Sequence, residues 1–115
     1  MTEKTENNTI NLTTNERTQQ EITISGNPGK PVGEDGEKML RRMNESHYAV
    51  TGWALEHWKI RENDRILDIG CGGGATLKRM SEEVRDGHLT GVDYSATSLE
   101  LSGKTNAEAL QQGKM

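Results

Sequence analysis

The sequence predicts an α/β fold in which a parallel, doubly wound sheet follows helices and a polar N-terminal segment. Three observations support this prediction. Two short apolar strands, at residues 65–69 and 89–93, are separated by a segment with helical periodicity. A glycine-rich loop follows the first strand, and a second helical segment follows the second strand. Strands that alternate with helices are typical of parallel sheets, because each crossover helix returns the chain to the start of the next strand.

Composition limits this chain to one small domain and excludes several classes of function. The 115 residues are only 30% hydrophobic and 3% aromatic, which is poor material for a large core. The net charge of −4 and the lack of a Lys/Arg run argue against nucleic acid as a partner. No apolar stretch approaches the roughly 20 residues of a membrane span. The N-terminus lacks the apolar core of a secretory signal, so we expect a cytoplasmic protein.

Residues 1–36 are predicted to be a disordered polar tail and linker. Their few apolar residues are scattered among Thr, Asn, Glu and Gln, so ordering the segment would bury too little apolar surface to offset its entropy. Pro28 and Pro31, with neighbouring glycines, indicate an extended or turning linker. A short helix is the alternative for this segment.

The ordered part is predicted to cover residues 37–115 and to begin with two leader helices. We place these helices at residues 37–45 and 48–58, with a break near Ser46. The apolar residues of the second helix recur at helical spacing, so we expect them to share one buried face. They are Val50, Trp53, Ala54, His57 and Trp58.

The first strand–helix unit is built around the strand at residues 65–69. The Asn63-Asp64 turn precedes this strand, and a helix over residues 75–84 follows the glycine loop. The apolar residues of that helix should face the sheet because they share one helical face. They are Leu77, Met80 and Val84.

The second unit begins after the Asp86-Gly87 turn, with a strand over residues 89–93. Ser95 is a typical N-cap for the helix predicted over residues 96–112, and Gly113 is its expected stop. We expect three of its apolar residues to face inward. They are Leu99, Ala107 and Leu110.

The glycine loop of residues 70–74 and the acid Asp93 are predicted to form a ligand site. Glycines accept positive φ angles and let a ligand lie against bare backbone. The following helix start leaves N–H groups free to face that ligand. In an open α/β sheet, ligands bind at the carboxyl ends of the strands, where the loop and Asp93 both lie. An acid about 20 residues after the loop can accept hydrogen bonds from ribose hydroxyls, so the pattern predicts an adenosine-type ligand. The alternative for Asp93 is a structural carboxylate beside Ser95.

The identity of the adenosine ligand depends on the residues around the loop. Gly70-x-Gly72-x-x-Ala75 also fits the dinucleotide fingerprint, which leaves an NAD(P)-binding or FAD-binding oxidoreductase open. Asp68 lies two residues before Gly70, where its carboxylate would repel a pyrophosphate. S-adenosyl-L-methionine has no phosphate and carries a sulfonium and an ammonium, which a nearby acid would favour. Asp68 therefore favours S-adenosyl-L-methionine.

Two segments resemble the conserved motifs of one enzyme family. Asp68-x-Gly70-x-Gly72-x-Gly74 resembles motif I of class I S-adenosylmethionine-dependent methyltransferases, and residues 91–95 (GVDYS) resemble the segment that follows it. The string ILDIGCGGG is far more specific than a lone GxGxxG. The resemblance extends over about residues 30–115, leader helices included.

The resemblance implies a Rossmann-like domain with S-adenosyl-L-methionine as its cofactor. It implies that the loop and the acid before it hold the methionine part, that Asp93 binds the ribose hydroxyls, and that Tyr94 lies near the adenosine. The residues predicted to bind the cofactor are Asp68, Gly70, Cys71, Gly72, Gly74, Asp93 and Tyr94.

Methyl transfer requires mainly that donor and acceptor are held in line. We assign no catalytic residue and no metal site; His47 is the best candidate for a general base, with a helix-capping role as its alternative. The acceptor is predicted to be a small molecule.

Two parallel strands are fewer than independent stability usually needs. We therefore expect the chain to be the N-terminal part of a methyltransferase domain, inactive by itself. A function of a different class is a non-catalytic interaction module in which a second chain supplies the missing strands along an exposed sheet edge.

Overall fold

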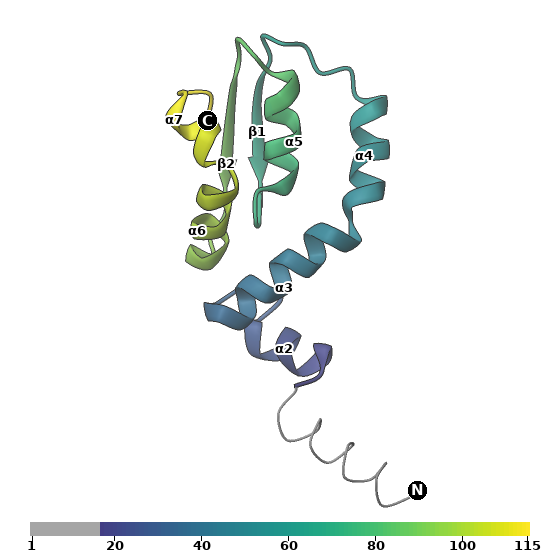
Figure 1. Cartoon of the computed structure of the whole chain (residues 1–115), viewed down its shortest axis with the longest axis vertical. Coiled ribbons are helices and arrows are strands. Elements are labelled where there is room, and N and C mark those ends of the chain that lie inside the picture. The colour runs from purple at the N-terminus through teal and green to yellow at the C-terminus, as the bar shows by residue number, and fades with distance from the viewer. Residues whose placement is uncertain (1–16) are drawn as a thin grey trace, which may run out of the picture.

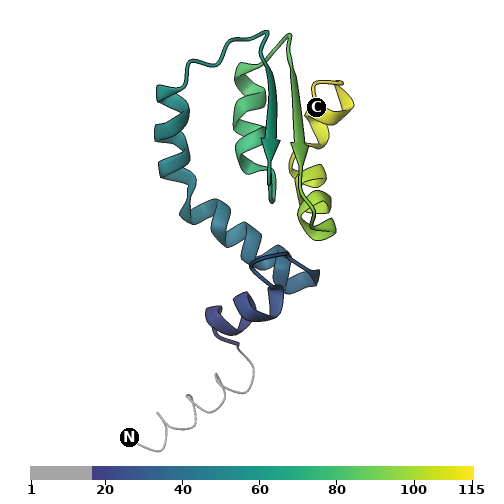
Figure 2. The same ribbon diagram turned by 180° about the vertical axis from the view of Figure 1, so that it is seen from behind.

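The computed structural model describes residues 17–115, so the predicted disorder of residues 1–16 lies outside the described part of the chain. Within these residues, three leader helices precede a β–α–β unit that is followed by two further helices, and the leader helices run from one end of the sheet up along its side (Figure 1). The view from behind shows α4 standing beside α5 (Figure 2). The elements are α2 (Gln19–Gly26), α3 (Gly33–Ser46), α4 (Tyr48–His57), β1 (Arg65–Ile69), α5 (Ala75–Glu83), β2 (His88–Val92), α6 (Ala96–Thr105) and α7 (Ala107–Gln111).

The two strands pair in parallel, with Ile66 opposite Leu89. These two residues face α5, and the α5 residues predicted to face inward are all buried, which confirms that face of the helix. The buried cluster consists of Cys71, Leu77, Met80, Val84 and Leu89. The parallel α/β arrangement is therefore confirmed, with β2 beginning one residue earlier than expected.

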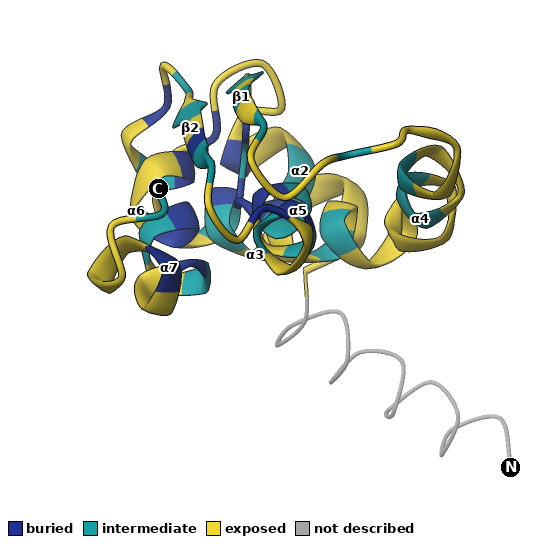
Figure 3. Cartoon of the chain, turned by 90° about the horizontal axis from the view of Figure 1, so that it is seen from above, coloured by how far each residue is buried: buried dark blue, intermediate teal, exposed yellow. Residues whose placement is uncertain are grey.

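The opposite face of the sheet is open. Seen from above, the strands lie on one side and the helices on the other (Figure 3). Leu67, Ile69 and Val92 point away from the helices, and Ile69 is 78% exposed. Residues 17–115 thus form one helical layer on the sheet, and the second layer of a doubly wound fold is not formed by them. No helix in this part of the chain is long and apolar enough to span a membrane.

The expected disorder is wrong for residues 17–36, because α2 and the first turn of α3 occupy part of that segment. The polar composition conceals local signals: Thr18 and Glu21 form a capping box at the start of α2. Gly26 then allows close packing, since a Cβ there would lie 2.8 Å from the Asp35 carbonyl carbon. Arg17 joins the two helices by donating to both carboxylate oxygens of Asp35, at 2.5 and 2.6 Å.

The expected core face of α4 is also wrong. Val50, Trp53 and Trp58 are exposed, and the ring of Trp53 contacts that of His57 in the same helix, with 4.4 Å between the ring centres. The helix turns its other side toward the core, where Leu55 contacts the buried cluster. The spacing correctly grouped the apolar residues, but it could not show which side of the helix would meet the rest of the chain.

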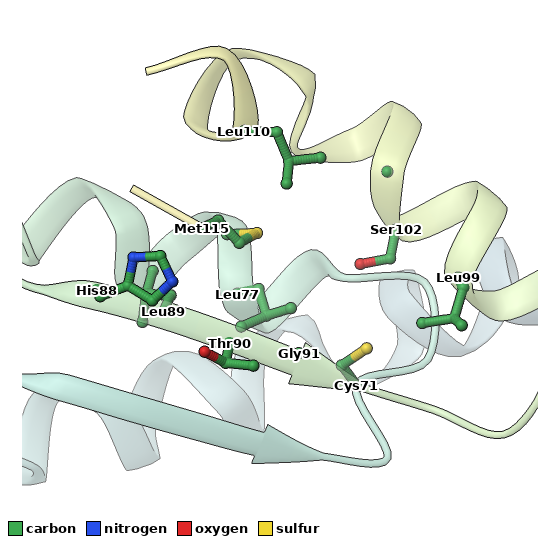
Figure 4. Close-up of a pocket in the computed structure, with 11 residues that line it drawn as sticks. Cys71, Leu77, His88, Leu89, Thr90, Gly91, Leu99, Ser102, Leu110 and Met115 are labelled. Atoms are coloured by element: carbon green, nitrogen blue, oxygen red, sulfur yellow. The ribbon is translucent and has the colours of Figure 1, made fainter. Parts of the chain in front are cut away.

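The helix predicted over residues 96–112 breaks at Asn106 into α6 and α7. Its inner face is formed by small residues around Leu101, while Leu99, Ala107 and Leu110 are exposed, contrary to expectation. Leu99 and Leu110 instead line a hollow along the outer edge of β2 (Figure 4). On that edge the N–H of Leu89 donates to the carbonyl of Lys114 at 2.9 Å.

Candidate functional site

The glycine loop continues the sheet beyond β1. The N–H groups of Gly70 and Cys71 both donate to the carbonyl of Val92, at 2.7 and 3.0 Å, which fixes the loop beside the end of β2. Gly70, Gly72 and Gly74 have φ angles of 79°, 55° and 80°, a region that only glycine enters at little cost. A Cβ at Gly70 would meet nothing within 4 Å. The loop therefore has the backbone geometry expected of a ligand cradle, with open space at its first glycine.

Asp93 connects the loop to the start of α6. One carboxylate oxygen accepts the N–H of Gly72 at 3.0 Å, and the other accepts the N–H of Ser95 at 2.9 Å. Ser95 is the N-cap of α6, as predicted, because its hydroxyl accepts the N–H of Ser98. Asp93 thus has a structural role beside Ser95, which was the alternative to ligand binding. Each carboxylate oxygen can accept more than one hydrogen bond, so a role in ligand binding remains compatible with this geometry.

Asp68 is the second acid at this edge, at the end of β1. It is half-buried, and within residues 17–115 its carboxylate accepts no hydrogen bond and pairs with no cation. Burial, and to a smaller extent the charge of Asp93, raises the pKa of Asp68. A half-buried carboxylate without a partner is costly, and a cationic group of a ligand would offset that cost.

Cys71 points into the core rather than toward the open side of the loop. Its sulfur contacts the buried cluster, and a Cβ at Gly91 would lie only 3.1 Å from it. Burial raises the pKa of the Cys71 thiol, which keeps it protonated near neutral pH. Cys71, one of the predicted cofactor-binding residues, can therefore contact a ligand only through its backbone.

Gly70 lies in the walls of two hollows. The outer hollow lies on the open side of the strand ends and is lined by Ile69, Gly70, Val92, Asp93 and Tyr94. The inner hollow, of about 180 Å³, lies between the α3–α4 corner and the loop. Its polar side chains are those of Asn44, His47, Tyr48, Thr51, Thr76 and Arg79.

The inner hollow contains residues that sequence reasoning did not assign. His47, the candidate base, lines this hollow. Thr51 and Arg79 line it too, but in the sequence they cannot be distinguished from ordinary polar residues of a helix. Lys30 was also missed: its ammonium lies 5.2 Å from the ring centre of Tyr94. Lys30 lies in the loop between α2 and α3. The hydroxyl of Ser95 holds that loop in place by donating to the carbonyl of Pro31.

The fold and the site place the chain among α/β proteins that carry a glycine loop and strand-end acids at the carboxyl edge of a parallel sheet. Residues 66–114 match the family described as "Methyltransferase domain". This part of the chain belongs to the class I methyltransferase family.

Three relatives illustrate the similarity. YrhH of Bacillus subtilis, named provisionally as a methyltransferase, is 32% identical over 78 residues, which are 68% of this chain and 43% of YrhH. "Uncharacterized methyltransferase YdaC" of the same organism is 29% identical over 54% of this chain and 34% of its own length. "Ubiquinone biosynthesis O-methyltransferase" of Aeromonas salmonicida is 45% identical over 43% of this chain and 18% of its own length. The chain thus spans less than half of each relative, and no solved structure matches it.

Proposed function

We propose that the chain binds S-adenosyl-L-methionine across its glycine loop and is the cofactor-binding part of a methyltransferase that acts on a small molecule. The observation that carries this proposal is the unpaired, half-buried carboxylate of Asp68 beside a glycine loop of positive φ angles. A sulfonium and an ammonium complement that carboxylate, and a pyrophosphate would be repelled by it. The family match of residues 66–114 supports the same choice over an NAD(P)-dependent oxidoreductase.

We assign one of the two hollows to each end of this cofactor. The inner hollow, whose wall includes Gly70 and Gly72, would take the methionine part. The outer hollow is apolar apart from Asp93, and it would take the adenosine, with Tyr94 beside it and Asp93 accepting from the ribose hydroxyls. Gly70 borders both hollows, and its open Cβ direction leaves the space that a ligand passing from one to the other requires.

When bound, the cofactor would supply an electrophilic methyl group on a sulfonium. The chain's own residues would hold that group and orient it toward the acceptor, which is the main requirement of an in-line displacement. His47 borders the inner hollow, and it would be the candidate to take a proton from the acceptor. A small-molecule acceptor is supported by the Aeromonas relative, which is named for ubiquinone biosynthesis, and by the net negative charge of the chain.

An amide NMR titration of the chain with S-adenosylhomocysteine tests the proposal, with NAD as the comparison ligand. We expect S-adenosylhomocysteine to shift the amide signals of Gly70, Gly72 and Asp93 and to bind more tightly than NAD. Tighter binding of NAD, or the absence of shifts at the loop, would show that the proposal is wrong.

A further inference from the structure

The guanidinium of Arg79 joins α5 to the first turn of α4. Its Nη1 donates to the carbonyl of Tyr48 at 2.7 Å, and its Cζ lies 4.0 Å from the centre of the Tyr48 ring. A Cβ at Gly52 would come within 2.6 Å of Nη2, so the guanidinium lies directly against the backbone of α4. The Arg79 side chain thus contacts α4 at two successive turns, at Tyr48 and at Gly52.

The rest of α4 is loosely held. No residue of α4 is fully buried. A hollow of about 410 Å³ lies between α4 and α5, with Leu55, Ile60 and Met80 in its wall. Arg79 borders this hollow on one side and the inner hollow of the candidate site on the other. Tyr48 borders both spaces as well, so the contact between Arg79 and Tyr48 lies between them at the start of α4.

We propose that Arg79 is a positioning residue that fixes Tyr48 and Thr51 over the inner hollow and thereby sets the width of the space for the methionine part of the cofactor. The inference rests on the proposed function. Beyond that function, it assigns Arg79 to the amino-acid end of the ligand alone. The adenosine end occupies the outer hollow, which α4 does not line.

Binding of two ligands to the Arg79→Met variant tests this distinction. S-Adenosylhomocysteine carries the amino-acid end, and 5′-methylthioadenosine lacks it. We expect Arg79→Met to weaken S-adenosylhomocysteine binding about tenfold, because the start of α4 loses a hydrogen bond of comparable strength that holds it over the inner hollow. Binding of 5′-methylthioadenosine should be unchanged. Lys78→Met is the matched control, because it removes the same charge from the neighbouring position of α5, where the side chain is exposed and borders a hollow beside α7.

Gly52→Ala tests the same contact without removing the charge. Ala favours a helix more than Gly does, so α4 itself should not be weakened, while the new Cβ must displace the guanidinium. We expect Gly52→Ala to reduce S-adenosylhomocysteine affinity selectively, as Arg79→Met does. Since both changes break one contact, the double variant should lose no more affinity than Arg79→Met alone.

The outcomes separate the two proposals. If the unaltered chain binds neither ligand, the proposed function is wrong and the inference is wrong with it. If it binds both, equal weakening of the two ligands by Arg79→Met would show a merely structural residue and overturn the inference. Unchanged affinity for S-adenosylhomocysteine in Arg79→Met and Gly52→Ala, or an equal loss in Lys78→Met, would also overturn it.

Discussion

The side-chain amide of Asn106 donates to the carbonyl of Gly74 at 3.0 Å and so ties the break between α6 and α7 to the last glycine of the loop. The same Nδ2 atom donates to the carbonyl of Ser102 at 3.0 Å, and Asn106 is almost completely buried. Its Oδ1 has no partner within the described residues. Residue 106 must therefore supply a hydrogen-bond donor, and its place at the break between α6 and α7 brings that donor to the glycine loop.

We expect Asn106→Ala to lower the free energy of unfolding by about 1–3 kcal/mol, because the carbonyls of Gly74 and Ser102 lose a buried donor. Asn106→Asp should be worse, since its carboxylate would face both carbonyls. Urea unfolding followed by circular dichroism measures the difference. Gln112→Ala, at an exposed position of the same region, should change little. A neutral Asn106→Ala would contradict the role assigned to this side chain.

Asp93→Asn should weaken S-adenosylhomocysteine binding about tenfold to hundredfold. The amide cannot replace both carboxylate oxygens as acceptors for Gly72 and Ser95, and hydrogen bonds to a charged group are worth about 1.5–3 kcal/mol. The amide of Gly72 should also exchange with solvent faster in the free chain. Calorimetric titration and hydrogen-exchange NMR provide the two readouts. Asp86→Asn is the control, because Asp86 is an exposed turn residue away from the loop, and an equal effect there would refute the prediction.

Asp68→Asn should change stability and binding in opposite directions. The pKa of Asp68 is raised in the folded chain, so the charged carboxylate destabilises the fold. The contribution of Asp68 to the free energy of unfolding is therefore most favourable below its ordinary pKa of 3.8, and it is lost as pH rises through the raised pKa of the folded chain. Asp68→Asn should therefore raise the thermal unfolding midpoint near neutral pH, and the gain should disappear in acid. Affinity for S-adenosylhomocysteine should fall about tenfold, because a charge-assisted contact is lost. A loss of stability at neutral pH would contradict the assigned pKa direction.

The Arg17–Asp35 pair should make the attachment of α2 dependent on pH. Hydrogen bonds from Arg17 and Ser25 lower the pKa of Asp35 from 3.8 to about 2. Stabilisation from a lowered pKa is present above the ordinary value and is lost as pH falls toward the folded value. We expect Asp35→Asn to loosen α2 near pH 6, seen as faster amide exchange at Glu21, and the difference from the unaltered chain to shrink as pH falls through about 2. Glu34→Gln is the neighbouring control and should behave like the unaltered chain at both values.

Local signals in the sequence were sufficient for the strand–loop–helix unit. The apolar run at residues 65–69, the glycines after it and the 3–4 spacing of Leu77, Met80 and Val84 all favour the same structure, and all three are present. The Ser95 N-cap was predictable for the same reason, since its hydrogen bond reaches only three residues along the chain. The loop and its two acids followed from this unit, because parallel strands bring their carboxyl ends to one edge.

Contacts between distant segments were not predictable in this way. The partner of Arg79 is Tyr48, 31 residues away, and that of Asn106 is Gly74, 32 residues away. Neither Arg79 nor Asn106 differs in the sequence from an ordinary polar helix residue. The exposed side of α4 was assigned wrongly for a related reason: periodicity defines which residues share a face, and only packing decides what that face meets.

The sequence by itself determined the parallel β–α–β unit, the glycine loop and the family of residues 66–114, because each depends on residues that are close along the chain. The tertiary structure alone decided that α2 is ordered against α3, that Trp53 is exposed, and that Asp93 holds Gly72 as well as bordering the outer hollow. These features depend on burial and on hydrogen bonds between segments that meet only in the folded chain.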